Sequence, residues 1–271
     1  MRKSASIFLS VCALFALMAA PGWGATFDVV ASGNGAYVGA SGLQAAIDAA
    51  SNGDTINVGA GTYALTSEIT LNKAVTLKGS GNPILDGQNK CRVINCKASA
   101  TIDGFVIANG NVGTTIIRSE ANAPNGGGLL IAADNVTGKN CSFSKNTANA
   151  GGGVKVDANN ATIINCVFSD NTVNAEYGYG GGLNFANIAS NISLKNCTFT
   201  ANSAHHGGGL YIYGRATVVN SSFSGNAATG GFGMGGGLYA GSDASVSSGT
   251  ATVTNCTFVE NSATGYGEEL C

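Results

Sequence analysis

One seven-residue motif constrains the fold more than any other feature: asparagine, cysteine or serine, any residue, phenylalanine, two further residues and a second asparagine. It occurs five times, beginning at Asn140, Asn165, Asn196, Asn220 and Asn255. Each copy is paired with three glycines followed by leucine or valine, and these triplets begin at Gly126, Gly151, Gly180, Gly207 and Gly235. The triplets start 25, 29, 27 and 28 residues apart. A nearly fixed period of this length predicts a repeat protein whose units stack on one another.

The repeats are predicted to be β structure. Helical repeats of similar length need apolar residues at 3.6-residue spacing, and these repeats instead show glycine triplets and β-branched alternation such as residues 161–164. Glycine is abundant, with 41 residues, whereas only 10% of residues are charged, against about 25% in ordinary globular proteins. The pattern therefore indicates short strands joined by tight turns, which is typical of a solenoid of β coils.

The core follows from the two-residue periodicity of strands, because residues i and i+2 share one face. Stacked coils lie about 4.8 Å apart, so each inward position forms a column along the solenoid. After each triplet, the first and third residues are predicted to point inward: Leu129/Ile131, Val154/Val156, Leu183/Phe185, Leu210/Ile212 and Leu238/Ala240. The motif predicts three further structural columns: Cys141, Cys166, Cys197, Ser221 and Cys256; Phe143, Phe168, Phe199, Phe223 and Phe258; and, at a turn, Asn146, Asn171, Asn202, Asn226 and Asn261.

The cysteines of the motif are interpreted as small packing residues. Ser221 replaces one of them without disturbing the repeat, which an obligatory disulfide or metal ligand would not tolerate. The sequence has no C-x-x-C pair of the kind found in zinc sites. We therefore predict no metal and no cofactor. Cys91, Cys96 and Cys271 lie outside the regular columns and are the better candidates for a disulfide in an exported protein.

The amino terminus is predicted to direct export. Arg2 and Lys3 precede an apolar run over residues 7–20, and small residues follow for cleavage after Gly24. The alternative, a membrane anchor, is disfavoured because the run is shorter than the ~20 residues that a span requires. Removing the leader shifts the formal net charge from −2 to about −4, which disfavours a nucleic-acid partner. We expect a secreted or cell-surface protein, including one associated with an outer membrane, without a membrane span once the leader is removed.

A cap is predicted ahead of the strict repeats. Ser41 is expected to cap a short helix over residues 41–50, whose Leu43, Ala46 and Ile47 share one face and would cover the open first coil. At the other end no polar cap precedes Cys271, so we expect this edge to contact a partner or a missing continuation. The predicted organisation is a signal peptide (1–24), an N-terminal cap with the first coil (25–62), and β-helix repeats (63–271, strict from 126).

Two family resemblances follow from these motifs. Residues 43–63, 73–87 and 101–105 resemble the amino-terminal coils of the pectin-lyase-like superfamily. This resemblance implies an all-β, single-stranded right-handed parallel β-helix with a short N-terminal capping helix, a fold that carries lyases, hydrolases, epimerases and non-catalytic binders. The repeats are also similar to the GGA[ILV] and FxxN motifs of chlamydial polymorphic outer membrane proteins, which are surface adhesins and autotransporters. This chain has GGG instead of GGA and lacks the alternating ten-residue strands of a terminal barrel, so the similarity implies an adhesin-like role without self-transport.

A candidate binding face comprises the outward residues of the strand after each triplet. Three tyrosines on adjacent coils, with His205, His206 and Arg215 nearby, would form a platform on which sugar rings stack. The alternative is an ordinary solvated face. The candidate ligand-binding residues are Tyr211, Tyr213, Tyr239, Lys155, Asp157 and Asn184, and the remaining outward positions are Leu130, Ala132, Ala186 and Gly241.

An enzymatic role is the second hypothesis. The pectin-lyase resemblance implies calcium-dependent lyases, which gather several carboxylates and a basic residue on neighbouring coils, whereas the outward face offers Asp157 alone. Asp86, Asp103, Arg118 and Glu120 are candidates to converge in the less regular coils, yet Asp-Gly pairs are also ordinary turns. We assign no catalytic residue. The predicted function is an exported, non-catalytic, adhesin-like protein that binds a glycan or a cell-surface protein; the alternative is a polysaccharide lyase or related carbohydrate-active enzyme.

Overall fold

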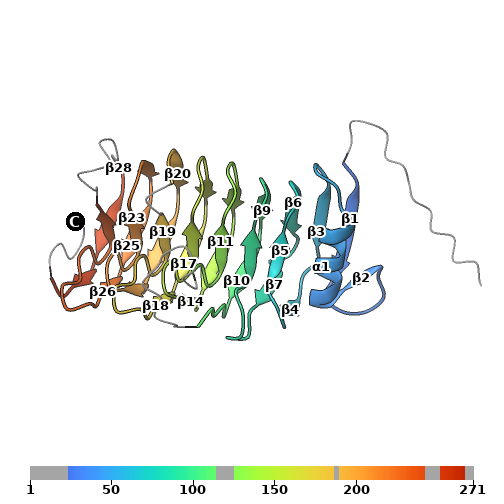
Figure 1. The fold of residues 1–271 in the computed structure, drawn as a ribbon, viewed down its shortest axis with the longest axis horizontal. Coiled ribbons are helices and arrows are strands. Elements are labelled where there is room, and N and C mark those ends of the chain that lie inside the picture. Colours follow the sequence, from blue (N-terminus) through green and yellow to red (C-terminus); the bar gives the residue numbers. More distant parts are fainter. Residues whose placement is uncertain (1–23, 114–124, 186–188, 242–250, 266–271) are drawn as a thin grey trace, which may run out of the picture.

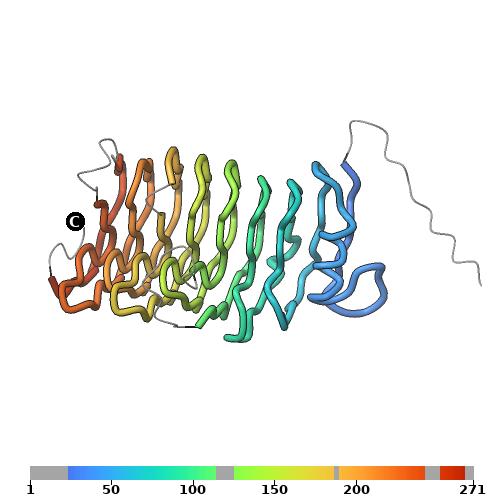
Figure 2. Tube along the Cα trace, in the orientation of Figure 1, coloured from blue at the N-terminus to red at the C-terminus, as the bar shows by residue number. Residues whose placement is uncertain are grey.

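The protein is a solenoid of short parallel strands. A computed structural model describes residues 24–113, 125–185, 189–241 and 251–265. Successive coils lie side by side along one axis from the amino-terminal to the carboxy-terminal end (Figures 1 and 2). The described strands pair in parallel and form four sheets, which confirms the predicted all-β parallel solenoid. No helix in the described ranges is long and apolar enough to cross a membrane. The predicted signal peptide lies, except for Gly24, outside these residues.

Sheets A and B form two sides of each coil from β3 onward. In spatial order, sheet A comprises β2 (Tyr37–Val38), β1 (Thr26–Val30), β3 (Thr55–Val58), β6 (Thr76–Gly79), β9 (Thr101–Asp103), β12 (Thr137–Lys139), β16 (Thr162–Ile164), β20 (Ile192–Lys195), β24 (Ala216–Val219) and β28 (Ala251–Thr254). Sheet B comprises β29 (Thr257–Val259), β25 (Ser222–Ser224), β21 (Thr198–Thr200), β17 (Val167–Ser169), β13 (Ser142–Ser144), β10 (Val106–Ala108), β7 (Ile84–Asp86) and β4 (Thr62–Ala64).

From β11 onward the strands of sheet C follow the glycine triplets, and the described strands of the short sheet D lie in the strict repeats. Sheet C comprises β27 (Leu238–Ala240), β23 (Leu210–Ile212), β19 (Leu183–Phe185), β15 (Val154–Val156), β11 (Leu129–Ile131), β8 (Ile94–Cys96) and β5 (Ile69–Leu71). Sheet D comprises β14 (Thr147–Ala148), β18 (Thr172–Val173), β22 (Ser203–Ala204), β26 (Ala227–Ala228) and β30 (Ser262–Ala263). Each strict coil therefore runs from sheet A through B and D to C.

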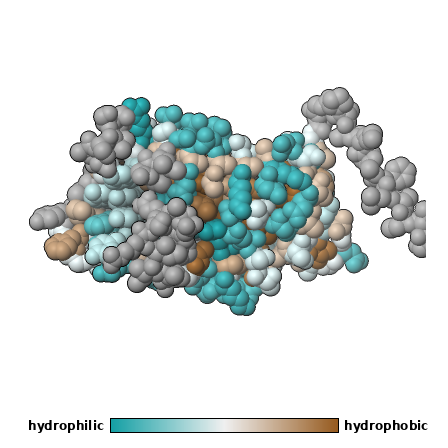
Figure 3. All heavy atoms as spheres, in the orientation of Figure 1, coloured by the Kyte–Doolittle hydropathy of each residue, from teal (hydrophilic) through white to brown (hydrophobic). Residues whose placement is uncertain are grey.

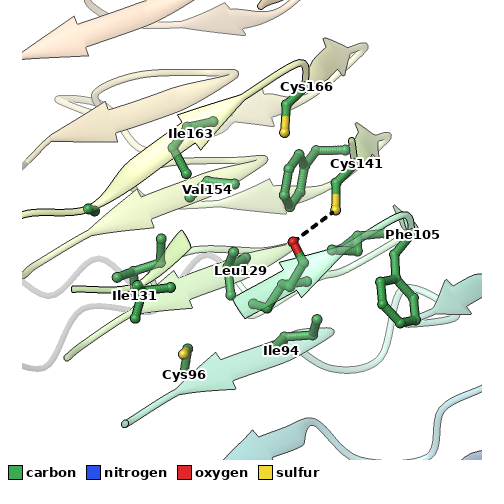
Figure 4. Close-up of a cluster of buried hydrophobic side chains, with 14 of the residues drawn as sticks. Ile94, Cys96, Phe105, Leu129, Ile131, Cys141, Val154, Ile163 and Cys166 are labelled. Carbon is green, nitrogen blue, oxygen red and sulfur yellow. Dashed lines mark hydrogen bonds between the residues drawn. The ribbon is translucent and has the colours of Figure 1, made fainter. Parts of the chain in front are cut away.

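The interior is filled by columns of identical or similar side chains. The phenylalanines of the motif stack with ring centroids 4.5–5.0 Å apart and interplanar angles of at most 12°. Each of the first four is fully buried, which stabilises the fold by roughly 1.5–3 kcal/mol per ring. The column of Cys141, Cys166, Cys197 and Ser221 lies at the corner before sheet B and is buried, while Cys256 in the last described coil is partly exposed. Figure 4 shows the thiol of Cys141 directed at the carbonyl of Ile102, 3.7 Å away.

One predicted core residue is not buried. Leu238 is buried, whereas Ala240 is exposed although it pairs in register with the buried Ile212 of the inward column. The physical reason is its place in the stack: β27 is the last described strand of sheet C, so no described strand packs beyond it. The partial exposure of Phe258 in β29, the last described strand of sheet B, has the same origin.

A third column, of buried asparagine amides, stabilises the turn from sheet B to sheet D. Asn171 Nδ2 donates to the carbonyl of Phe143 (2.9 Å) and to Asn202 Oδ1 (2.9 Å). The N–H of Asn171 donates to the same Oδ1 (3.1 Å). The pattern recurs from coil to coil, and Asn146, Asn171, Asn202 and Asn226 are completely buried. Each amide therefore joins its own coil to the two beside it.

The first asparagine of the motif makes the corner between sheets A and B. Asn140, Asn165, Asn196, Asn220 and Asn255 all have φ between 51° and 54°. Asparagine tolerates this left-handed conformation better than other residues with a side chain, which explains its recurrence at a one-residue bend. The side chains also form an exposed ladder, in which the amides of Asn165, Asn196 and Asn220 each donate to the asparagine of the preceding coil over 3.2–3.3 Å.

The amino-terminal cap begins earlier than predicted. The helix α1 spans Gly39–Ala49, and Ser41 is not its N-cap; Val38 occupies that position without a side-chain hydrogen bond. The reason is that Gly39, at φ 67°, turns the chain directly from β2 into the helix. The predicted apolar face is buried, and Gln44 bonds both the N–H and the carbonyl of Thr70 in β5, at 2.9 and 3.2 Å. The helix thus satisfies backbone groups on the edge of sheet C.

Candidate functional site

The outward column of sheet C is less open than the sequence suggested. Lys155, Asn184 and Tyr211 are neighbours in register and only 4%, 1% and 9% exposed. The chain before each strand bends back over them: a Cβ added at Gly180 or at Gly207 would lie 2.8 Å from the Cβ of Asn184 or of Tyr211. The prediction of an open face is therefore wrong for these three residues, because period-two alternation gives the facing of a side chain and not what packs over it.

Lys155 and its neighbours form an internal polar network. Lys155 Nζ donates to Asn184 Oδ1 (2.8 Å) and lies 3.5 Å from Asp157 Oδ1. Because this buried ammonium already has two partners within the protein, it does not present a free cation to a ligand. Ala186, predicted to flank it, lies outside the described residues.

An aromatic cluster extends beyond the tyrosines singled out from the sequence. Tyr211 and Tyr239 stack at 4.9 Å and 10°, and Tyr211 lies 4.6 Å from Tyr179. Tyr179 stacks on His206 (5.7 Å), which lies 4.4 Å from His205. Tyr213, partly exposed, lies 6.3 Å from Tyr211. Sequence reasoning missed Tyr179, although the residue before each triplet is a recognisable position: Asn125, Ala150, Tyr179 and His206 pair in one column.

The connections from sheet D to sheet C alternate in length. The length of each connection is counted from the buried asparagine to the first glycine of the next triplet. Two connections span five residues, and the two that alternate with them span nine. The longer connections each carry an aromatic residue three positions before the triplet. The short connections are 146–151 and 202–207, and the long ones are 171–180 and 226–235.

Both long connections end in the same tight turn. The N–H of the glycine after the aromatic residue donates to the carbonyl three positions earlier, over 3.1 Å at Gly178 and 2.9 Å at Gly233. Tyr177 and Phe232 therefore occupy equivalent places in the two turns, where they are 66% and 79% exposed. Leaving a large ring in water forfeits roughly 1.5–3 kcal/mol of burial. The two rings are therefore exposed at equivalent positions of two coils.

A cleft of about 560 Å³, here called the aromatic cleft, lies between the two turns. The short coil between them supplies its floor through Ser203 and His205, and the His205 ring lies 5.4 Å from that of Tyr177. Among the described residues that line the cleft, Glu176 is the single acidic one, and the hydroxyls of Thr172 and Thr229 also line it. Outside the grey atoms, the face in Figure 3 mixes hydrophilic and apolar side chains and shows no single large apolar patch.

Packing around the two histidines sets the shape and protonation of this region. Gly230 lies against His205, since a Cβ added there would fall 2.0 Å from His205 Nδ1. His206 Nδ1 accepts a hydrogen bond from the N–H of Met234 (3.3 Å), an acceptor role that requires the neutral imidazole. Burial, and secondarily the neighbouring His205, lowers the pKa of His206. The histidine beside the cleft floor is therefore held neutral.

The acidic residues considered for catalysis do not converge. Asp86 lies in sheet B and accepts a backbone N–H two residues later (2.8 Å), as in an ordinary turn. Asp103 lies in sheet A and accepts from an asparagine amide (2.7 Å), whereas Asp157 follows a strand of sheet C. Arg118 and Glu120 lie outside the described residues. Within the described ranges, no group of three or more His, Cys, Asp or Glu is arranged to hold a metal ion.

The candidate disulfide cysteines are free thiols in the structure. Cys96 faces the core, with Sγ 3.2 Å from the carbonyl of Ala98, and burial raises its pKa to about 11. Burial, followed by the charge of Glu68, also raises the pKa of Cys91. The two are not bonded to each other, and Cys271 lies outside the described residues.

Comparison with known proteins establishes the class of this architecture. Residues 74–258 match the family described as "Right handed beta helix region". The chain belongs to this right-handed β-helix family, which agrees with its four parallel sheets. No curated protein and no solved structure matches it.

Proposed function

We propose that the protein is an exported, non-catalytic and adhesin-like β-helix that binds glycans in the aromatic cleft. The supporting observation is the pair of solvent-exposed rings, Tyr177 and Phe232, on equivalent turns around a cleft with a polar floor. The faces of sugar rings pack on aromatic side chains, while their hydroxyls bond to polar groups such as Ser203. Export is inferred from the amino-terminal leader pattern.

Binding is proposed ahead of catalysis because of the composition of the cleft. Its described lining contains one carboxylate, Glu176. Glycosidic hydrolysis generally uses two carboxylates about 5–9.5 Å apart, and calcium-dependent elimination uses several. A cell-surface protein is the other partner class considered, and the experiment below separates it from a glycan.

The test is affinity electrophoresis of the purified protein through gels containing neutral glycans or polyuronates, with and without calcium. We expect retardation by at least one glycan without formation of unsaturated or shortened products. Tyr177→Ala and Phe232→Ala should each weaken this binding about tenfold or more. The matched control is Val167→Ala, which shortens an exposed apolar side chain (42% exposed) on sheet B and should leave binding unchanged.

Three results would overturn the proposal. Glycan turnover would make the protein an enzyme. Unchanged binding in both aromatic variants would place the glycan elsewhere. No binding to any glycan, combined with adhesion to cells stripped of glycans, would support a protein partner instead.

A further inference from the structure

We infer that the aromatic cleft selects uncharged glycans and discriminates against polyuronates, the acidic substrates implied by the pectin-lyase resemblance. This inference rests on the proposed function and specifies its ligand class. It begins with the charge of the lining: among the described residues that line the cleft, Glu176 is acidic and none is lysine or arginine. A uronate carboxylate bound there would have a like charge beside it and no lysine or arginine to pair with.

The charge pattern extends along the whole of sheet D. Its five strands and the described connections that follow them contain no lysine or arginine, and Glu176 is their only charged residue. The missing cations matter because a polyuronate carries a carboxylate on every ring, so each further ring adds an uncompensated charge. The formal net charge of the chain, −2, acts in the same direction over longer distances.

The polar groups of the cleft suit hydroxyls. Thr172 in β18 and Ser203 in β22 are partners in register, so their hydroxyls repeat at the spacing of one coil, about 4.8 Å. Thr229 continues the hydroxyl lining in the next coil. Hydroxyls both donate and accept hydrogen bonds, which matches the mixed donors and acceptors of a neutral sugar. The cleft thus combines aromatic walls, neutral hydrogen-bonding groups and one negative charge.

The test compares chains that differ only in charge. For each backbone of the panel, the neutral form and the uronate form of the same linkage are used, for example methyl-esterified and de-esterified polygalacturonate, at low salt. We expect the wild-type protein to bind the neutral form at least tenfold more tightly. Added salt should narrow this difference, because screening weakens the repulsion of the uronate.

A charge-reversing variant locates the source of the selectivity. Glu176→Lys should bring the two forms to within about twofold by improving uronate binding. The matched control, Asp28→Lys, makes the same charge change on an exposed residue of β1, at the opposite end of the solenoid (Figure 1), and should keep the wild-type preference. Thermal melting of both variants verifies that they fold.

The outcomes separate this inference from the proposed function. Equal or tighter binding of the uronate form by the wild-type protein would overturn the inference while leaving glycan binding in place. Retention of the neutral preference in Glu176→Lys would overturn the assignment of selectivity to this cleft. Failure to bind either form of any backbone would overturn the proposed function, and the inference with it.

Discussion

The buried asparagine column predicts that a single amide supports three coils. Asn202 Oδ1 accepts from the N–H and the Nδ2 of Asn171 (3.1 and 2.9 Å), and Asn202 Nδ2 donates to the carbonyl of Phe168 and to Asn226 Oδ1 (both 2.9 Å). Asn202→Ala removes all four hydrogen bonds and leaves their partners buried. At about 1 kcal/mol for each bond lost, the free energy of unfolding should fall by about 4 kcal/mol, which is large for one substitution.

The measurement is urea unfolding followed by circular dichroism, with Asn196→Gly as the matched control from the same coil. Asn196 belongs to the exposed ladder, and its φ of 53° suits glycine, so the control should lose no more than about 1 kcal/mol. If Asn202→Ala cost less than about 1 kcal/mol, or no more than the control, the column would not support the fold in the way described.

Three further predictions follow from the packing. Because the pKa of His206 is lowered in the folded state, the unfolded chain binds a proton first, and the free energy of unfolding falls as the pH drops below about 6.5. His206→Gln should flatten this decline in urea titrations at pH 5 and 8. An unchanged decline would contradict the lowered pKa of His206. Gly230→Ala should displace His205 and weaken glycan retardation about tenfold. The control Gly231→Ala, whose Cβ meets nothing within 4 Å, should change retardation less than twofold. Equal effects of the two variants would contradict the placement of His205 on the cleft floor. Cys166→Ser should lower the free energy of unfolding by about 1 kcal/mol or less in thermal melts, since serine occupies this column in another coil. Cys166→Leu should lower it by about 1–3 kcal/mol through overpacking. Similar losses in the two variants would argue against a packing role for the cysteine.

The fold could be predicted from the sequence because equivalent residues of stacked coils have the same surroundings. A phenylalanine such as Phe199 must meet the same neighbours as Phe168, so both positions keep the same residue and the period becomes visible. The cap was predicted less well. Ser41 fits the preferences for an N-cap, yet a positive φ at Gly39 begins the helix earlier, and backbone geometry of this kind has no counterpart in hydrophobic periodicity.

The candidate site was only partly accessible. Alternation placed Tyr211 correctly on the outward side of sheet C, but its burial depends on residues that arch back from the preceding connection, such as Tyr179. Tyr177 and Phe232 lie in insertions that break the strict period, so the regular spacing of the repeats does not identify them. Their shared signal appears only when the two long connections are compared with each other, three residues ahead of each glycine triplet.

The most direct test of the central claim is hydrogen exchange of the protein with and without a saturating glycan that retards it in the gel assay. Glycan binding in the aromatic cleft predicts added protection confined to residues 172–178, 203–205 and 229–232, with sheet B unchanged. Protection elsewhere, or no change at these three segments, would contradict the claim that the aromatic cleft is the binding site.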